Sequence, residues 1–288
     1  MNNPISNPEY FQFSTINCRG KLIDLSKPKI MGILNITPDS FSDGGRFNNE
    51  SAALLQVEKM VKEGASIIDI GAQSTRPNSQ LLSAAEEIFR LKTLISQIKI
   101  EFPEILISLD TFYAETVQFG FEEGIDLIND ISGGMFDEKM FEIVAETQLP
   151  YILMHINPTY ESMHEKLLDE DIILKMNYYF FEKIEQLRKL GVKDIILDPG
   201  FGFGKTVEQS HQMIEETDAI GFGRYPLLIG ISRKSFIYQP LGKLPLDIDE
   251  ETQKLHLKVL EKGAKILRVH DVLATQKTIN LYLEKNQS

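Results

Sequence analysis

The sequence predicts an α/β protein: a single-domain (β/α)8 TIM barrel with a short N-terminal hairpin extension. Eight short segments rich in Ile, Val and Leu alternate with segments of helical periodicity. No linker, charge block or low-complexity stretch interrupts this alternation. The chain has 288 residues, 42% of them apolar and 25% charged, so it can bury a large core without a metal ion or a disulfide.

The eight candidate strands are mostly continuous apolar runs. Such runs are typical of strands covered on both faces, as in parallel sheets. An open doubly wound sheet is the alternative, but it calls for a nucleotide-binding fingerprint after the first strand, and none stands there. In chain order the candidate strands are Lys29–Ile36, Ser66–Ala72, Ile105–Asp110, Leu127–Ser132, Tyr151–His155, Asp194–Gly200, Leu227–Ser232 and Ile266–Asp271.

The segments between the strands carry apolar residues at helical spacing. Leu54, Val57 and Val61 mark the first helix, and the pattern extends over Ile172–Leu190 and Thr252–Gly263. Several helices end at a glycine that leads straight into the next strand, which is a common C-terminal signal. These glycines are Gly64, Gly124, Gly191 and Gly263.

Residues 1–28 precede the barrel domain of residues 29–288, and we expect a hairpin around Cys18–Gly20 that closes the bottom of the barrel. Cys18 is the only cysteine, so it cannot form an internal disulfide. No apolar run reaches membrane-spanning length and no charged-then-apolar leader stands at the N-terminus. We therefore expect a reduced, soluble, cytoplasmic protein without a membrane partner.

The charge balance limits the ligands. The chain has 42 acidic and 30 basic residues and a net charge of −12, which argues against nucleic-acid binding. An anionic ligand must therefore be held by a local cluster of positive side chains.

In a barrel of this class the chemistry lies at the carboxyl ends of the strands. Four polar residues that end or follow different strands favour a shared function, namely Asp110, Asn129, Asp198 and Lys234. Asp69 stands inside an apolar run and needs partners whether or not it serves the site. For other strand-end carboxylates a local turn or helix cap is the simpler interpretation; these are Asp43, Asp130 and Asp271.

Arginine is concentrated at the same ends. Of the thirty basic residues eight are arginine, and four of these fall in or just after strand ends: Arg46, Arg76, Arg233 and Arg268. The planar guanidinium matches phosphate oxygens, so the pattern predicts a phosphate or diphosphate pocket. His270 shares a strand face with Arg268 and can add a donor.

The stretch Gly200–Thr206 is rich in glycine but misses the phosphate-loop pattern by one residue. We expect its glycines to let the backbone approach a flat ligand, with Phe201 or Phe203 either offering an aromatic face or packing in the core. A carboxylate accepts well from adjacent NH and NH2 groups, as on an aminopyrimidinone ring. We assign that contact to Asp198, with Asn129 reading the remaining edge.

Several segments resemble the signature sequences of the dihydropteroate synthase family. The resemblance spans about residues 28 to 283 and is carried by fifteen consecutive positions, Met31–Gly45, and by four further segments: Asp69–Pro77, Asp198–Lys205, Ser232–Ser235 and Arg268–Asp271.

The resemblance implies condensation of 6-hydroxymethyl-7,8-dihydropterin diphosphate with p-aminobenzoate, giving 7,8-dihydropteroate and diphosphate in folate synthesis. It further implies a transferase that is a homodimer and acts with Mg²⁺ by dissociative substitution. Carried over position by position, Asn35 binds Mg²⁺ and diphosphate, whose oxygens also contact Thr75, Arg268 and His270. The pterin is held by Asp110, Asn129, Asp198 and Lys234, beside Phe203.

The p-aminobenzoate site implied by the resemblance is shaped by the first two loops, with Phe41, Ser42, Arg76 and Pro77, and its carboxylate reaches the Ser235 amide. Asp110 and Lys234 are the residues we expect to take part in catalysis. This chain departs from the family pattern at Ala72, Gln73, Asn78 and Asn157.

Two alternatives share the pterin set. A pterin-dependent methyltransferase has the same barrel but no diphosphate to bind, and a non-catalytic pterin-binding paralogue is expected to lose phosphate or loop residues. This chain keeps both sets, which favours the synthase; the phosphate-side residues are Thr75, Arg76, Lys234, Arg268 and His270.

Overall fold

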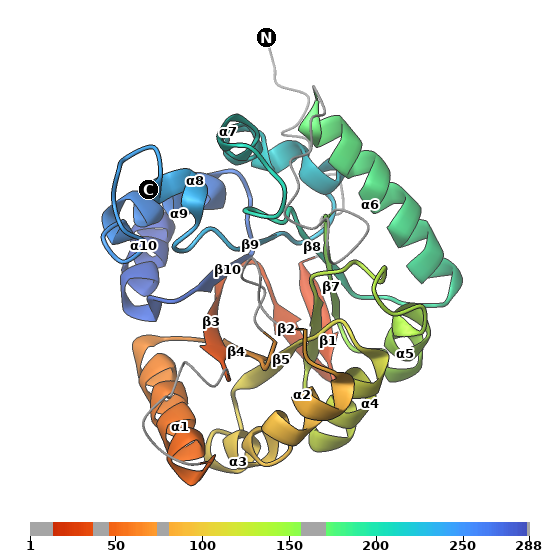
Figure 1. Cartoon of the computed structure of the whole chain (residues 1–288). Coiled ribbons are helices and arrows are strands. Elements are labelled where there is room, and N and C mark those ends of the chain that lie inside the picture. The colour runs from red at the N-terminus through yellow and green to blue at the C-terminus, as the bar shows by residue number, and fades with distance from the viewer. Residues whose placement is uncertain (1–13, 37–45, 74–80, 157–170, 287–288) are drawn as a thin grey trace.

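A computed structural model describes residues 14–36, 46–73, 81–156 and 171–286. Within them eight parallel strands form one sheet in the order β8-β7-β6-β5-β4-β3-β10-β9. Helices surround this sheet in the view down the barrel (Figure 1). The strands are β3 Lys29–Asn35, β4 Ile67–Gly71, β5 Leu106–Asp110, β6 Leu127–Asp130, β7 Tyr151–Met154, β8 Ile195–Asp198, β9 Leu228–Ile229 and β10 Ile266–Val269.

All eight strands lie where the apolar runs predicted them, and the single (β/α)8 fold is confirmed. The sheet closes between its two outermost strands through one bridge, Leu197 with Leu227, supported by the Leu197 amide donating to the Pro226 carbonyl at 2.9 Å. Because β9 has only two residues, few hydrogen bonds join it to β8, and the sheet forms a near-barrel.

The described helices are α1 Arg46–Glu63, α2 Ala84–Leu91, α3 Leu94–Glu101, α4 Ala114–Glu123, α5 Met140–Thr147, α6 Ile172–Lys189, α7 Val207–Glu215, the 3-10 helix η3 Thr217–Gly223, α8 Ser235–Tyr238, α9 Asp249–Glu261 and α10 Val272–Lys285. Gly64 and Gly124 end α1 and α4 with φ of 109° and 97°, as expected for helix-ending glycines. None of these helices is long and apolar enough to cross a membrane.

The strict alternation of one strand with one helix is wrong at three places. Two helical segments, not one, lie between β4 and β5, between β8 and β9, and between β9 and β10. Segments as short as α8, with four residues, escape a periodicity that needs 11 or more residues to be read.

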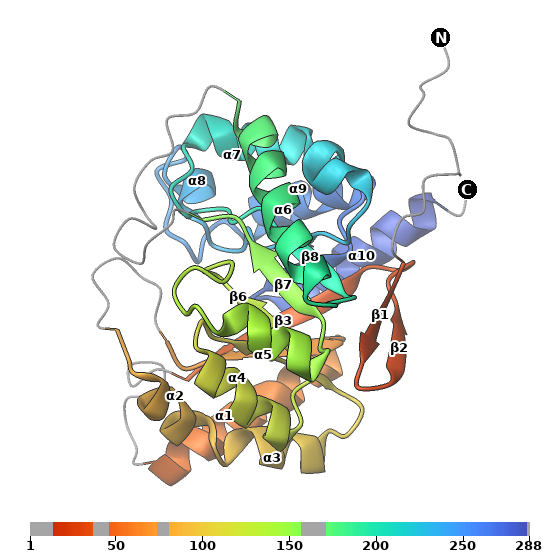
Figure 2. The ribbon, with the colours of Figure 1, turned by 90° about the vertical axis from the view of Figure 1, so that its right-hand side faces the viewer.

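The lower half of the barrel interior is apolar. Each of the eight barrel strands contributes one buried side chain to a common cluster: Met31, Ile67, Leu106, Leu127, Ile152, Ile196, Leu228 and Ile266. The strands β1 Thr15–Cys18 and β2 Lys21–Asp24 form an antiparallel hairpin that adds Ile16 and Cys18 to this cluster. Figure 2 shows the hairpin at the right-hand end of the barrel. The division of the chain at residue 28 stays a prediction.

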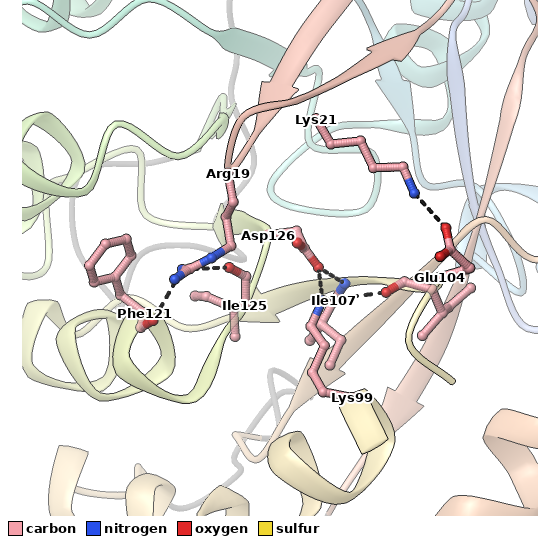
Figure 3. Close-up of polar contacts among 9 residues, drawn as sticks. Arg19, Lys21, Lys99, Glu104, Ile107, Phe121, Ile125 and Asp126 are labelled. Carbon is pink, nitrogen blue, oxygen red and sulfur yellow. Dashed lines mark hydrogen bonds and ion pairs between the residues drawn. The ribbon is translucent and has the colours of Figure 1, made fainter. Parts of the chain in front are cut away.

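Polar contacts hold the hairpin against the barrel (Figure 3). The Arg19 guanidinium donates to the carbonyls of Phe121 and Ile125 at 3.1 and 3.4 Å and lies 4.7 Å from the centre of the Phe121 ring. Lys21 pairs with Glu104 at 2.7 Å. The bottom of the barrel is thus closed by apolar packing inside and by hydrogen bonds around it.

Candidate active site

The inward-facing side chains change from apolar to polar along the strands. Side chains two residues apart on a strand point to the same face. Two positions beyond the apolar layer therefore stand five polar side chains on five different strands: Asp69, Ser108, Asn129, Asp198 and Arg268. The carboxyl ends of all eight parallel strands lie at one end of the barrel, so this layer faces the same mouth.

A four-residue network joins the strands β4, β5, β6 and β10. The Arg268 Nε donates to Asp69 Oδ2 at 2.6 Å, and Arg268 Nη2 donates to Asp110 Oδ2 at 2.8 Å. The Asn129 Nδ2 donates to the same Asp69 oxygen at 3.0 Å. One guanidinium therefore bridges two carboxylates, and the amide of Asn129 is attached to the same cluster.

The charge state of Asp110 is set by this crowding. Burial is the main cause that raises the pKa of Asp110 to about 7, and the nearby charge of Asp69 adds to it, against the charge of Arg268. Burial alone lowers the pKa of Arg268, but the charges of Asp69 and Asp110 outweigh it and raise that pKa. Asp110 is thus a carboxyl that can gain or lose a proton near neutral pH, beside an arginine that stays charged.

Strand register places three predicted residues side by side. Asn35 pairs with Gly71, Gly71 with Asp110, and Asp110 with Asn129. A Cβ atom at Gly71 would lie 3.2 Å from the Asp110 Cβ, so glycine leaves room there for the carboxyl. The exposed Asn35 ends β3 at this level.

Asp198 ends β8 on the opposite wall of the barrel. It is 7% exposed, and its Oδ1 accepts the Gly200 amide at 2.7 Å. Burial raises the pKa of Asp198, while the Gly200 hydrogen bond and the charges of Lys234 and Arg268 oppose the rise. Asp198 and Arg268 each stand two residues beyond an apolar inward-facing residue, Ile196 and Ile266, so both side chains face the same end of the barrel interior.

A sharp turn after β9 positions Lys234. Arg233 has a left-handed φ of 60°, and the Lys234 amide donates to the Ile231 carbonyl at 3.2 Å. The Lys234 ammonium consequently lies 4.6 Å from the centre of the Phe203 ring. Burial lowers the pKa of Lys234 to about 8, helped by the charge of Arg268 and opposed by Asp198.

The structure separates the two phenylalanines that the sequence left open. Phe201 is 1% exposed and stacks on Phe236 at 5.7 Å in the main core. Phe203 lies instead in a small apolar cluster that includes Met154 and Ile131 at the carboxyl ends of β7 and β6. Phe203, with Lys234 over its ring, therefore lies at the carboxyl ends of the strands, where the sequence predicts the site.

The remaining described residues of the predicted site lie at the ends of β9 and β10. Ser232 Oγ and His270 Nδ1 are 3.1 Å apart, and the His270 amide donates to Ser232 Oγ at 3.3 Å. Ser235 begins α8 directly after Lys234. These contacts connect the segment after β9, which leads to Lys234, with the end of β10, which carries Arg268.

Two of the strand-end carboxylates make local contacts, and several other residues of the predicted site lie outside the part of the chain that the structure describes. Asp130 accepts the Ser132 and Gly134 amides at 2.7 and 2.8 Å, and Asp271 caps α10, so the local-turn interpretation describes both. Thr75 and Arg76 lie outside the described residues, as do Phe41, Ser42, Asp43 and Pro77. Arg46 begins α1, but its side chain is outside the described part of the chain.

Of the departures from the family pattern, Gln73 has a structural account in its side-chain contact, whereas Ala72 makes its contact through the backbone. The Gln73 side chain accepts the Leu82 amide at 2.9 Å, and the Ala72 carbonyl accepts from Arg90 at 3.2 Å. Both residues therefore tie the end of β4 to the segment that leads into α2. Asn78 and Asn157 lie outside the described residues.

Sequence reasoning did not single out Lys205. Its ammonium donates to the His155 carbonyl at 2.7 Å and so ties the loop after β8 to the end of β7. Burial lowers the pKa of Lys205 to about 7, with the charge of Asp198 opposing and that of Lys234 adding to the effect. The available signal was its position at the end of a glycine-rich strand-end loop.

Comparisons with known proteins agree with this geometry. The family described as "Pterin binding enzyme" matches residues 31–270. A dihydropteroate synthase of Streptococcus pyogenes serotype M3 is 40% identical over 263 residues, which cover 89% of this chain and 95% of that protein.

Two solved structures of the Xanthomonas albilineans dihydropteroate synthase share the fold. The structure with 4-aminobenzoic acid has a TM-score of 0.88 at 30% identity and covers 96% of this chain and 99% of that one. The structure in complex with 7,8-dihydropteroate has a TM-score of 0.84 at 29% identity, covering 95% and 99%. The chain is thus a transferase that belongs to the dihydropteroate synthase family of pterin-binding enzymes.

Proposed function

We propose that this chain condenses 6-hydroxymethyl-7,8-dihydropterin diphosphate with p-aminobenzoate to give 7,8-dihydropteroate and diphosphate. The observation that carries the proposal is that polar groups able to bind a pterin ring and the buried Arg268 lie together at the carboxyl end of the barrel. Asp110 and Asn129 lie in the same hydrogen-bonded network as Arg268, and Asp198 lies across from it. The X. albilineans relative is solved with both 4-aminobenzoic acid and 7,8-dihydropteroate, which supports the same substrates here.

The pterin is held by its polar edge and by one face. Asp198 is placed to accept from adjacent NH and NH2 groups, while Asn129 offers an amide to the next edge. Phe203 and Met154 provide apolar surface for the ring. Lys234, held over Phe203, can donate to a ring oxygen or nitrogen.

The reaction we propose breaks the bond between the exocyclic methylene and the diphosphate oxygen, and then forms a carbon–nitrogen bond to the amine. Arg268, His270 and Thr75 stabilise the negative charge that grows on the leaving diphosphate. Asp110 stabilises the positive charge that grows on the pterin. Preorganised contacts of this kind contribute about 3 to 4 kcal/mol each to transition-state stabilisation. The aromatic amine is already neutral at pH 7, so its proton can leave to water after the bond forms.

Asn35 is the residue that would hold Mg²⁺. Its exposed amide is a hard oxygen donor at the carboxyl end of β3, level with Asp110 in the sheet. Mg²⁺ prefers oxygen ligands, keeps several waters and is commonly completed by substrate phosphates, so the Asn35 amide oxygen fits it as a neutral oxygen ligand beside the diphosphate. When bound, Mg²⁺ would neutralise charge on the diphosphate. Asn35→Ala is expected to raise the Mg²⁺ concentration needed for half-maximal rate while leaving the affinity for free pterin, measured by calorimetry, within about twofold.

The p-aminobenzoate part of the proposal relies on the family resemblance. It assigns Phe41, Ser42, Arg76 and Pro77 to the walls of this site and the Ser235 amide to the carboxylate. The homodimer is proposed on the same basis, and sedimentation equilibrium of the full chain tests it.

The decisive experiment is an assay of diphosphate release from the pterin diphosphate, with and without p-aminobenzoate. The synthase reaction predicts Mg²⁺-dependent release that is coupled to formation of dihydropteroate and stimulated by p-aminobenzoate. A methyltransferase or a non-catalytic pterin-binding protein would bind the pterin without releasing diphosphate. Pterin binding without release would therefore reject the proposed reaction.

A further inference from the structure

Asp69 is a buried carboxylate to which the proposed function gives no ligand contact. It lies on β4, one layer below the ends of the strands, and is 0% exposed. Three side chains from three other strands donate to it. Ser108 Oγ donates to Oδ1 at 2.6 Å, and Asn129 Nδ2 and Arg268 Nε donate to Oδ2 at 3.0 and 2.6 Å.

Asp69 fixes which way the Asn129 amide points. The Asp69 Oδ2 accepts hydrogen bonds from Arg268 Nε and Asn129 Nδ2, so the NH2 group of Asn129, and not its oxygen, faces Asp69. The amide oxygen and the second N–H then remain for a ligand. An acceptor next to a donor matches an amino group next to an unprotonated ring nitrogen, whereas the flipped amide would present its groups in the wrong order.

The same carboxylate oxygen orients Arg268. The guanidinium is held at Nε by Asp69 and at Nη2 by Asp110, so its plane is defined at two points. Neither carboxylate engages its other terminal nitrogen, Nη1, which leaves that group for an anion. The group that reads the ring and the group that binds the leaving anion therefore share a single anchor atom.

We propose that Asp69 is a positioning residue, whose Oδ2 anchors Asn129 and Arg268 together and thereby couples recognition of the aminopyrimidinone edge to binding of the diphosphate. This inference rests on the proposed function. If Asp69 served only to neutralise a buried arginine, its loss would lower stability and leave the selectivity of the site unchanged.

Two affinity ratios measure the role, both obtained by calorimetry on the full chain with Mg²⁺. The first compares pterin with pteridin-4-one, which lacks the 2-amino group. The second compares 6-hydroxymethylpterin diphosphate with 6-hydroxymethylpterin. Asp69→Ala is expected to reduce each ratio about tenfold, because a misoriented amide and an unanchored guanidinium each lose about one good hydrogen bond.

Two matched variants separate positioning from stability. Asp69→Asn can keep its oxygen toward Asn129 and Arg268 while its NH2 faces the Ser108 hydroxyl, which can accept, so it is expected to restore most of both ratios. Ser108→Ala removes the third donor to Asp69 without touching the other two, and both ratios should persist even where the melting temperature falls. Unchanged ratios in folded Asp69→Ala would overturn the proposal.

A measurement on the unsubstituted protein covers the case in which Asp69→Ala does not fold. The side-chain amide of Asn129, identified in nitrogen-resolved NMR by its loss in Asn129→Ser, should have one proton protected from exchange with water. Two rapidly exchanging protons would refute the anchor. If the unsubstituted protein binds neither pterin nor its diphosphate, the proposed function fails; if it discriminates and Asp69→Ala does too, only the role of Asp69 fails.

Discussion

The raised pKa of Asp110 predicts a specific pH dependence of stability. Its carboxyl has a pKa of about 7 in the folded chain, mainly because of burial, and about 3.9 when unfolded. Between these values the folded state holds more protons than the unfolded state, so the free energy of unfolding falls as the pH rises. The stabilisation from the proton is complete below about pH 4 and is lost as the pH passes 7.

Comparison with Asp110→Asn isolates this contribution, since the other groups titrate in both proteins. Each pH unit between the two pKa values corresponds to about 1.4 kcal/mol, so the whole interval is worth about 4 kcal/mol. Between pH 5 and pH 8 the native protein should lose about 2 to 3 kcal/mol relative to Asp110→Asn. Any difference between the neutral Asp110 carboxyl and the Asn amide in packing and hydrogen bonding adds an offset that does not vary with pH.

Urea unfolding at pH 5, 6, 7 and 8, followed by circular dichroism, measures the difference. Glu104→Gln is the control, because hydrogen bonding to Lys21 lowers the pKa of Glu104, and its contribution is lost only as the pH falls below the ordinary glutamate pKa of about 4.3. Its profile should run parallel to that of the native protein over this range. A parallel profile for Asp110→Asn as well would show that Asp110 is ionised throughout this range. It would refute the reasoning that burial and the charge of Asp69 raise the pKa of Asp110.

Three further predictions use other parts of the structure. Lys234→Ala should weaken both free pterin and p-aminobenzoate in calorimetry and reduce turnover, because Lys234 lies between Phe203 and the start of α8; unchanged turnover would reject its assignment. Arg268→Ala should abolish the gain in affinity that the diphosphate brings, and an equal loss of free pterin binding would contradict the role of Arg268 at the diphosphate. The same variant should destabilise the fold by about 3 to 5 kcal/mol at pH 8, because two buried carboxylates lose their cation. Arg19→Ala should lower the free energy of unfolding by about 1 kcal/mol through two lost hydrogen bonds, whereas Lys21→Ala, which removes only an exposed ion pair, should have almost no effect in the same urea titration.

The sequence by itself determined the order of the elements and the end of the barrel at which the polar residues gather. Continuous apolar runs need cover on both faces, and helix-ending glycines such as Gly64 mark where several of the helices return to the sheet. Period-two spacing then places Asp69, Asn129 and Arg268 two residues beyond apolar inward positions. These are local properties of the chain, so they can be read without coordinates.

Tertiary structure alone decided which polar side chains contact one another. The sequence grouped Arg268 with the leaving anion and Asp110 with the ring, and gave Asp69 no defined role. The folded chain brings all three together across 199 positions of sequence, through distances that depend on the register and closure of the barrel. Phe201 and Phe203 illustrate the same limit: they are two residues apart and chemically identical, and only the packing of the loop after β8 sends one into the core and the other to the site.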